Sequence, residues 1–247
     1  MPIELPKYGP IEIQTQRRKL TVTNSKVPGT DAYYASLAYP EDQKESCIAL
    51  CKRPSDAHEA FKVLTSCSSK NIAKPLGVWE VEGQNIAYIV FPSIAGALKS
   101  IDRKCIFEME DESEPSSSTA FFTDQGCMIF VDLIMAVRCV NELNERQLPM
   151  KPLKLEKGSI FYQLKADGQY HVLLADFADK DKSHGAGGGN RRKNKDVKTV
   201  NWNGLGKFLK ELGVNIKPNS ELANLADLLG KNSVNFDDLV WEPALWK

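Results

Sequence analysis

In the stretch Tyr170-His-Val-Leu-Leu-Ala-Asp-Phe-Ala-Asp179, a predicted strand runs directly into a carboxylate. The four apolar residues from Val172 to Ala175 predict a short buried strand, and Asp176 follows at once. Residues 180–198 are then a run of Lys, Gly, Asn and Arg that lacks the side chains needed for packing. A carboxylate between a buried strand and such a loop is well placed to hold a cation or a phosphate. The alternative is that Asp176 only caps the strand.

The composition is that of a soluble globular protein. The 247 residues fit one two-lobed domain or two small ones, and 42% of them are hydrophobic and 26% charged. Lys plus Arg equals Asp plus Glu at 32 each, so the net charge favours neither a nucleic acid nor a membrane as partner.

Targeting signals are also not apparent in the sequence. Residues 1–8 are polar and contain proline, so we expect no signal peptide. The longest apolar run, 127–140, carries two charges and is too short to span a bilayer, which predicts a core helix. The six cysteines form no CxxC pair, so we expect reduced core residues of a cytoplasmic or nuclear protein, without zinc.

Residues 1 to about 95 are rich in predicted strands. These strands cover residues 20–23, 33–39, 47–53, 72–79 and 86–91. In the third of them, Ile48, Leu50 and Lys52 share one face. The polar residues 82–85 predict a turn that joins the last two strands into a hairpin.

A helix is predicted from Pro54, directly after the third strand. Ser55 or Asp56 is expected to cap its first turn. The apolar face of this helix is expected to carry Phe61, Leu64 and Cys67.

From about residue 96 the pattern becomes helical. Helices are predicted at 97–103, 121–146, 202–212, 222–229 and 236–239, and a packed tail at 241–246. The acidic, serine-rich residues 108–119 and the run 180–198 are expected to be flexible loops. A small hairpin of 159–164 and 171–174 is expected to turn at residues 166–169.

Five strands with one helix after the third, followed by a helical half, resemble the order of elements in protein kinases. The resemblance implies one α+β domain over residues 1–247 with a bilobal, kinase-like fold. Its β-rich N-lobe, with one main helix, covers residues 1 to about 95. Its reduced helical C-lobe covers about 96–247.

Individual motifs extend the resemblance. Ile48-Ala-Leu-Cys-Lys52 resembles the strand whose lysine contacts the nucleotide phosphates, and Glu59 is similar in place to the helix glutamate that holds this lysine. Tyr88-Ile-Val-Phe-Pro-Ser-Ile94 resembles the last strand running into the hinge, with Phe91 as gatekeeper. Ala175-Asp-Phe-Ala178 resembles the metal-binding Asp-Phe-Gly motif, with alanine in place of glycine. The implied nucleotide-binding residues are Lys52, Glu59, Phe91, Ser93, Ile94 and Asp176.

The ligands implied by these residues are ATP or ADP, with or without Mg²⁺, and the implied metal ligand is Asp176. The alternative role for Lys52 and Glu59 is structural: the two residues would form an ion pair that only fixes the helix. Further along, Val200-Asn-Trp-Asn-Gly-Leu-Gly206 resembles the start of a C-lobe helix, with Asn201 in place of aspartate. Val240-Trp-Glu-Pro-Ala-Leu-Trp246 is similar to the tail of the unfolded-protein-response sensor kinase–ribonucleases.

The groups that transfer phosphate are largely missing. Leu148-Pro-Met-Lys-Pro-Leu-Lys154 stands where a catalytic loop would have its aspartate, and it contains no carboxylate. Lys154 corresponds to the loop lysine, and Ser159, a poor metal ligand, stands in the place of the second metal-binding residue. The expected glycine-rich turn, 23–34, retains only Gly29.

Three functions remain open. The first is a pseudokinase, a catalytically impaired signalling or scaffold module that binds protein partners and is regulated by nucleotide. The second is a weak or atypical Ser/Thr kinase in which Asp179 or Asp181 replaces the missing base. The third is an RNA-associated factor acting in trans through Arg191-Arg-Lys-Asn-Lys195, a basic run that is equally explained as a solvated surface.

Overall fold

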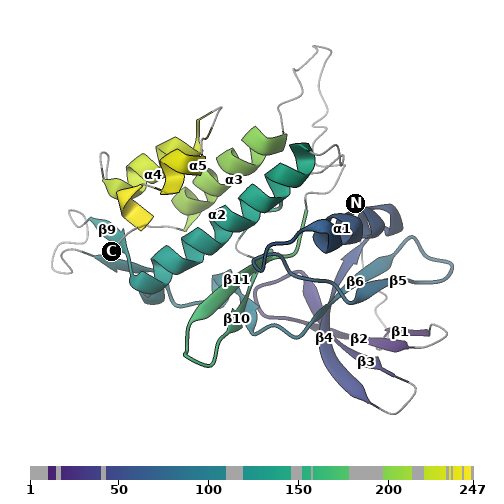
Figure 1. Cartoon of the computed structure of the whole chain (residues 1–247). Coiled ribbons are helices and arrows are strands. Elements are labelled where there is room, and N and C mark those ends of the chain that lie inside the picture. The colour runs from purple at the N-terminus through teal and green to yellow at the C-terminus, as the bar shows by residue number, and fades with distance from the viewer. Residues whose placement is uncertain are drawn as a thin grey trace.

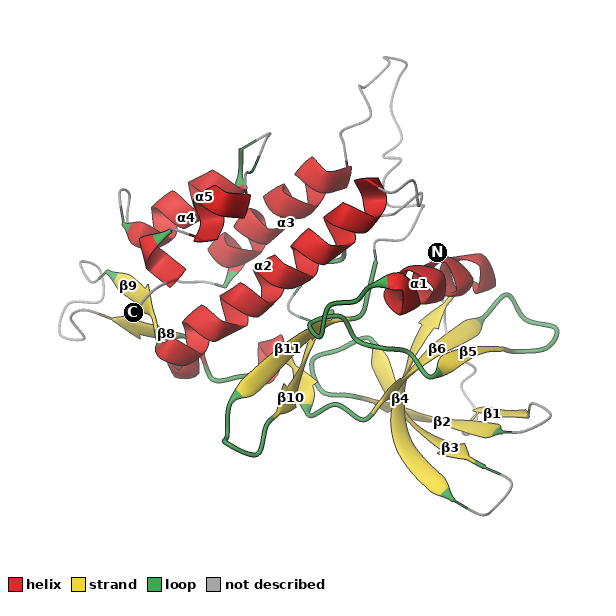
Figure 2. Cartoon of the chain, in the orientation of Figure 1, coloured by secondary structure: helices red, strands yellow, loops and turns green. Residues whose placement is uncertain are grey.

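The computed structural model describes residues 11–14, 18–39, 43–109, 119–145, 152–156, 158–177, 197–212, 220–231, 234, 236–240 and 242–245. The fold is α+β, with a curled antiparallel sheet and five helices in these residues (Figures 1 and 2). The large sheet and helix α1 form one part of the molecule, and helices α2 to α5 gather in the other. The small sheet that contains β10 and β11 lies between them.

The large sheet has six strands in the order β1-β2-β3-β4-β6-β5. The strands are β1 (Ile11–Gln14), β2 (Lys19–Lys26), β3 (Ala32–Ala38), β4 (Lys44–Lys52), β5 (Gly77–Glu80) and β6 (Ala87–Pro92). Alternation along β4 divides its side chains as predicted, because Ile48 and Leu50 join the main core while Cys47 and Ala49 join a second cluster on the other face.

Helix α1 (Pro54–Ser66) follows β4 and packs against β5 and β6. The predicted capping is wrong. Pro54 occupies the first helical position, where its missing N–H costs nothing, so Arg53 becomes the N-cap residue without a side-chain cap. Phe61 is only partly buried, and the fully buried apolar residues of α1 are Ala57, Ala60, Val63 and Leu64.

The strand predicted at 72–79 begins only at Gly77. Ile72 instead forms an isolated parallel bridge with Leu174, and the amide of Leu174 donates to the carbonyl of Asn71. The loop after α1 is therefore hydrogen-bonded to the strand that leads to Asp176.

The helices of the second part are α2 (Asp124–Glu145), α3 (Val197–Glu211), α4 (Glu221–Leu229) and α5 (Phe236–Val240). Helix α2 starts three residues later than predicted because Phe121 belongs to a strand, β9 (Ala120–Phe122), which pairs with β8 (Phe107–Met109). The predicted helix 97–103 is replaced by two short 3₁₀ turns, Leu98–Ser100 and Arg103–Cys105, on either side of buried Ile101.

The predicted hairpin is confirmed as β10 (Ile160–Leu164) and β11 (Tyr170–Leu174), which pair in an antiparallel register. Its turn contains Gly168 at φ 82°, a left-handed conformation that favours glycine. Strand β7 (Gly96–Ala97) pairs with β10 and completes the small sheet. In the predicted tail, Ala244 and Leu245 are buried, as expected.

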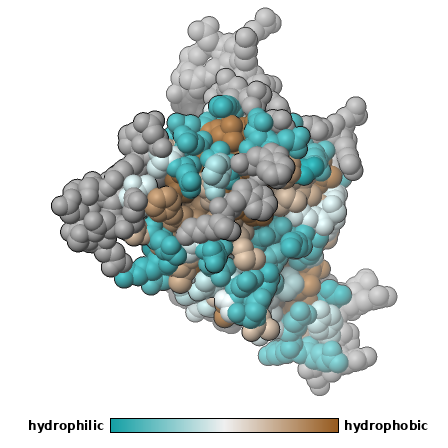
Figure 3. All heavy atoms as spheres, turned by 60° about the vertical axis from the view of Figure 1, so that its left-hand side comes forward, coloured by the Kyte–Doolittle hydropathy of each residue, from teal (hydrophilic) through white to brown (hydrophobic). Residues whose placement is uncertain are grey.

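One large apolar cluster extends from the inner face of the large sheet to the helices. On the face visible in Figure 3, the surface is mostly hydrophilic, and hydrophobic side chains appear in separate patches. Among the described residues, no helix combines the length and the apolar character that crossing a membrane requires.

Candidate functional site

Two of the predicted site residues meet across the junction between the large sheet and β11. The Nζ atom of Lys52, at the end of β4, lies 2.5 Å from Oδ1 of Asp176. The two side chains are 8% and 5% exposed. Lys52 also donates to the carbonyl oxygen of Phe177 at 3.3 Å, and Oδ1 of Asp176 accepts the Phe177 amide at 2.9 Å. The result is a buried ion pair in which the carboxylate orientation is fixed by its own backbone.

A second lysine approaches the other carboxylate oxygen. Nζ of Lys154 lies 3.7 Å from Oδ2 of Asp176, and the Lys154 amide donates to the Asp176 carbonyl at 3.1 Å. Burial alone would lower the pKa of Lys154, but the charges of Asp176 and Asp31 and a hydrogen bond to Asp31 outweigh burial and raise it. Asp176 is thus flanked by the ammonium groups of two lysines.

The turn between β2 and β3 contacts Lys154, the second lysine beside Asp176. Asp31 Oδ2 lies 3.1 Å from Nζ of Lys154, which joins the turn to the segment 152–156. Gly29, with φ 75°, and buried Thr30 shape the turn, and Thr30 Oγ1 donates to the Val27 carbonyl at 2.9 Å. A Cβ on Gly158 would lie only 2.7 Å from the Gly29 carbonyl oxygen, so the turn packs directly on the backbone beside Lys154.

Asparagine 201 holds the segment that carries Lys154. Its Oδ1 accepts the Leu153 amide at 2.8 Å, and its Nδ2 donates to Oδ1 of Asn141 at 2.8 Å. Both asparagines are buried. Leu153 also forms an isolated antiparallel bridge with Phe177, so α2, α3 and the Asp176 region are connected through this segment.

The other predicted site residues lie on β6, on the segment after it and on α1. Phe91 is buried on β6 opposite Ile48, Ser93 is exposed, and Ile94 is partly buried. Glu59 lies on α1 and is partly exposed, so its pairing with Lys52 stays a prediction.

Sequence reasoning missed the burial of Asp56. It lies three residues before Glu59 on α1 and is only 7% exposed. A buried carboxylate is costly unless its charge is compensated, so Asp56 is also a candidate for a structural role near the start of α1.

A metal site is not evident in the described part of the chain, where no group of three or more His, Cys, Asp or Glu side chains converges. Ser159 is buried and its amide donates to the Glu156 carbonyl. Several predicted functional residues lie outside the described residues: 148–151, Ala178, Asp179, Asp181 and the basic run 191–195.

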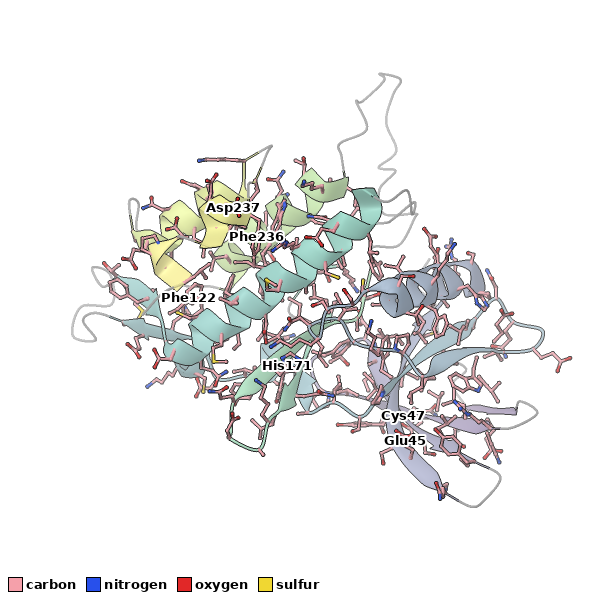
Figure 4. The ribbon with its side chains drawn as sticks, in the orientation of Figure 1. Glu45, Cys47, Phe122, His171, Phe236 and Asp237 are labelled. Atoms are coloured by element: carbon pink, nitrogen blue, oxygen red, sulfur yellow. The ribbon has the colours of Figure 1, made fainter. Side chains whose placement is uncertain are left out.

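Histidine 171 forms a contact that sequence reasoning also missed. His171 lies on β11 (Figure 4). Its Nδ1 lies 3.0 Å from Oδ2 of Asp132 on α2, and its Nε2 lies 3.0 Å from the carbonyl oxygen of Lys70, in the loop after α1. The Val172 amide donates to the same Asp132 oxygen at 3.2 Å. These bonds join β11 to α2 and to the loop after α1. The partners are far apart in sequence, so no local pattern indicates them.

The comparisons with known proteins add no family: no protein-family model matches the chain, and no curated protein is significantly similar to it.

The Asp31–Lys154 contact should stabilise the fold slightly and with a defined pH dependence. Burial would raise the pKa of Asp31, but the hydrogen bond and charge of Lys154, with Lys26, lower it below its usual 3.8. A lowered carboxyl pKa stabilises the fold above about pH 4 and loses this effect as pH falls through the folded-state value. Because the Asp31 carboxylate is largely exposed, we expect Asp31→Asn to cost about 0.2–1 kcal/mol at pH 7. Urea unfolding of both proteins should show this difference disappearing as the pH falls through the lowered pKa of Asp31. A difference that grows in acid would contradict the contact.

The His171–Asp132 contact should show energetic coupling. We expect a double-mutant cycle of His171→Ala and Asp132→Ala to give a coupling energy of about 0.5–3 kcal/mol in urea unfolding. The exposed Arg138–Glu142 pair on the same helix, with atoms 2.6 Å apart, is the matched control and should give less than about 0.5 kcal/mol. Equal coupling in both cycles would show that the histidine contact has no special role.

Proposed function

We propose that the chain is a protein kinase-like binding module that does not transfer phosphate, a pseudokinase. In this interpretation residues 1–247 form one domain, with an N-lobe to about residue 95 and a C-lobe from about residue 96. The observation that carries the proposal is the contact between Lys52 and Asp176. In the kinase arrangement, these are the lysine that contacts phosphate and the aspartate that binds metal. They meet at the junction where a nucleotide would lie.

Impaired catalysis is supported by what surrounds the pair. Phosphate transfer needs a carboxylate near the acceptor hydroxyl, and residues 148–154 contain none. It also needs Asp176 to bind a metal ion, whereas the two oxygens of Asp176 face the ammonium groups of Lys52 and Lys154. A metal would have to displace at least one lysine. The module would therefore act through contacts with protein partners, as a signalling scaffold.

Regulation by nucleotide, the remaining part of the proposal, requires the turn at Asp31 to open. A triphosphate above Asp176 would compete with Asp31 for Lys154 and would have to lift Gly29 from Gly158. We therefore expect ATP to raise the melting temperature of Asp31→Asn more than that of the wild type, independently of Mg²⁺. An equal rise in both proteins would show that the turn does not restrict access.

The central test is a transfer assay with labelled ATP, the whole chain and a generic protein acceptor. We expect no more label transfer with Mg²⁺ than with EDTA. The competing function, a weak kinase, predicts Mg²⁺-dependent transfer that is lost in Asp179→Asn or Asp181→Asn, the two residues suggested as the replacement base. Such a result would overturn the pseudokinase proposal. These variants avoid the buried pair, so a loss of folding is not expected to obscure the outcome.

A further inference from the structure

Two cysteine thiols are neighbours where the loop after α1 meets α2. Cys67 is the C-cap residue of α1, and its amide donates to the Val63 carbonyl. Its side chain is buried in the main core and lies within hydrogen-bond reach of the thiol of Cys139, on α2. The six cysteines all lie in the described part of the chain, and none of them forms a disulfide there.

A groove gives solvent access to one of the two thiols. Its volume is about 490 Å³, and it is lined by residues 68–71 on one side and by a face of α2 that includes Val131, Met135 and Cys139 on the other. Cys139 is partly exposed and lines this groove, whereas Cys67 is buried and does not line it. A small solute can therefore reach Cys139 first.

The environment of Cys67 also disfavours its direct oxidation. Burial, with a further contribution from Cys139, raises the pKa of Cys67 to about 12, so that Cys67 remains a thiol at neutral pH. A buried thiol of this kind reacts slowly with oxidants in solution. It is nevertheless well placed to react with an oxidised neighbour, because the two thiols lie within hydrogen-bond reach and Cys139 lines the same groove as residues 68–71, which follow Cys67.

We propose that Cys139 and Cys67 form a peroxide-sensitive pair that closes into a reversible disulfide. In the first step the sulfur of Cys139 attacks the O–O bond of a hydroperoxide. The peroxide is reduced to an alcohol or water, and Cys139 becomes a sulfenic acid. In the second step the Cys67 thiol attacks that sulfur, the S–S bond forms, and the hydroxyl leaves as water with the thiol proton. A dithiol such as dithiothreitol reverses the reaction.

The disulfide would tie the end of α1 to α2, next to the His171 contact with Lys70 and Asp132. Because Lys52 precedes α1 and Asp176 follows β11, the cross-link would limit movement between the two parts that hold the Lys52–Asp176 pair. It would do so whether or not the module binds nucleotide. The inference therefore does not depend on the proposed function.

The test treats the whole folded chain with hydrogen peroxide and analyses it by intact mass and non-reducing peptide mapping. We expect a loss of mass equal to two hydrogen atoms and a peptide that joins Cys67 to Cys139. Dithiothreitol should reverse both changes. The melting temperature of the oxidised protein should rise by about 5–10 °C.

The matched controls are serine variants of single cysteines. Cys139→Ser and Cys67→Ser should abolish the mass loss and the melting shift, whereas Cys105→Ser should retain both. Cys105 is partly buried like Cys139, but its thiol neighbours the Tyr170 hydroxyl instead of another cysteine. Circular dichroism of each reduced variant establishes that it is folded. The proposal is overturned if peroxide only adds oxygen to Cys139, or if the joined peptide contains a different pair of cysteines.

Discussion

Replacing Asp176 with asparagine is expected to lower the free energy of unfolding by about 3–5 kcal/mol, because it removes the buried carboxylate that Lys52 contacts at 2.5 Å. Asparagine keeps the size of the side chain and can still accept the Phe177 amide through Oδ1. The change therefore removes the charge with little effect on packing. A loss of this size is a large share of the stability of a typical domain, about 5–15 kcal/mol. Urea unfolding followed by circular dichroism gives the measurement.

The matched control is Asp31→Asn, which removes the charge of another carboxylate that contacts Lys154. Asp31 is mostly exposed, so its pair is screened by water and contributes little. If Asp176→Asn proved no more destabilising than Asp31→Asn, the buried pair would not be a main stabilising contact of the site.

The sequence predicts most elements of this fold because their signals are local. Alternation from Cys47 to Lys52 predicts both the strand β4 and the face on which Lys52 lies. The hairpin of β10 and β11 is indicated by Asp167 and Gly168 between two apolar runs. Errors occur where a tertiary contact takes precedence over a local pattern, as when Ile72 bridges Leu174 instead of starting β5.

The candidate site is predicted only in part, for the same physical reason. The resemblance to kinases implies that Lys52 and Asp176 both bind nucleotide, but the partner it implies for Lys52 is Glu59, and the direct Lys52–Asp176 contact was not predicted. The contact between Asp31 and Lys154 has no comparable signal, since it joins two polar segments that are 123 residues apart. The charge of Asp31 is ordinary for a turn, and only the path of the backbone over Gly158 brings it to the lysine.

The second large effect is expected at Asn201, whose side chain connects α3 to the segment that carries Lys154. Asn201→Ala should lower the free energy of unfolding by about 2–4 kcal/mol, since it leaves the Leu153 amide and Oδ1 of Asn141 buried without their partner. Loss of the bond to Leu153 should also loosen residues 152–156. Hydrogen exchange at the Leu153 and Lys154 amides should therefore become faster in the variant.

Asn201→Asp is the informative comparison, because it keeps the oxygen that accepts the Leu153 amide. Nδ2 of Asn141 is buried and has no hydrogen-bond partner among the described residues. In the wild type, Oδ1 of Asn141 accepts a hydrogen bond from Nδ2 of Asn201. In the aspartate variant a carboxylate oxygen replaces this donor, and rotation of the Asn141 amide would let Nδ2 of Asn141 donate to that oxygen. We therefore expect Asn201→Asp to be less destabilising than Asn201→Ala and to keep the slow exchange at Leu153. If the aspartate variant were the less stable of the two, desolvation of its charge would outweigh the recovered hydrogen bonds. Asparagine would then be required at this position by the buried network itself.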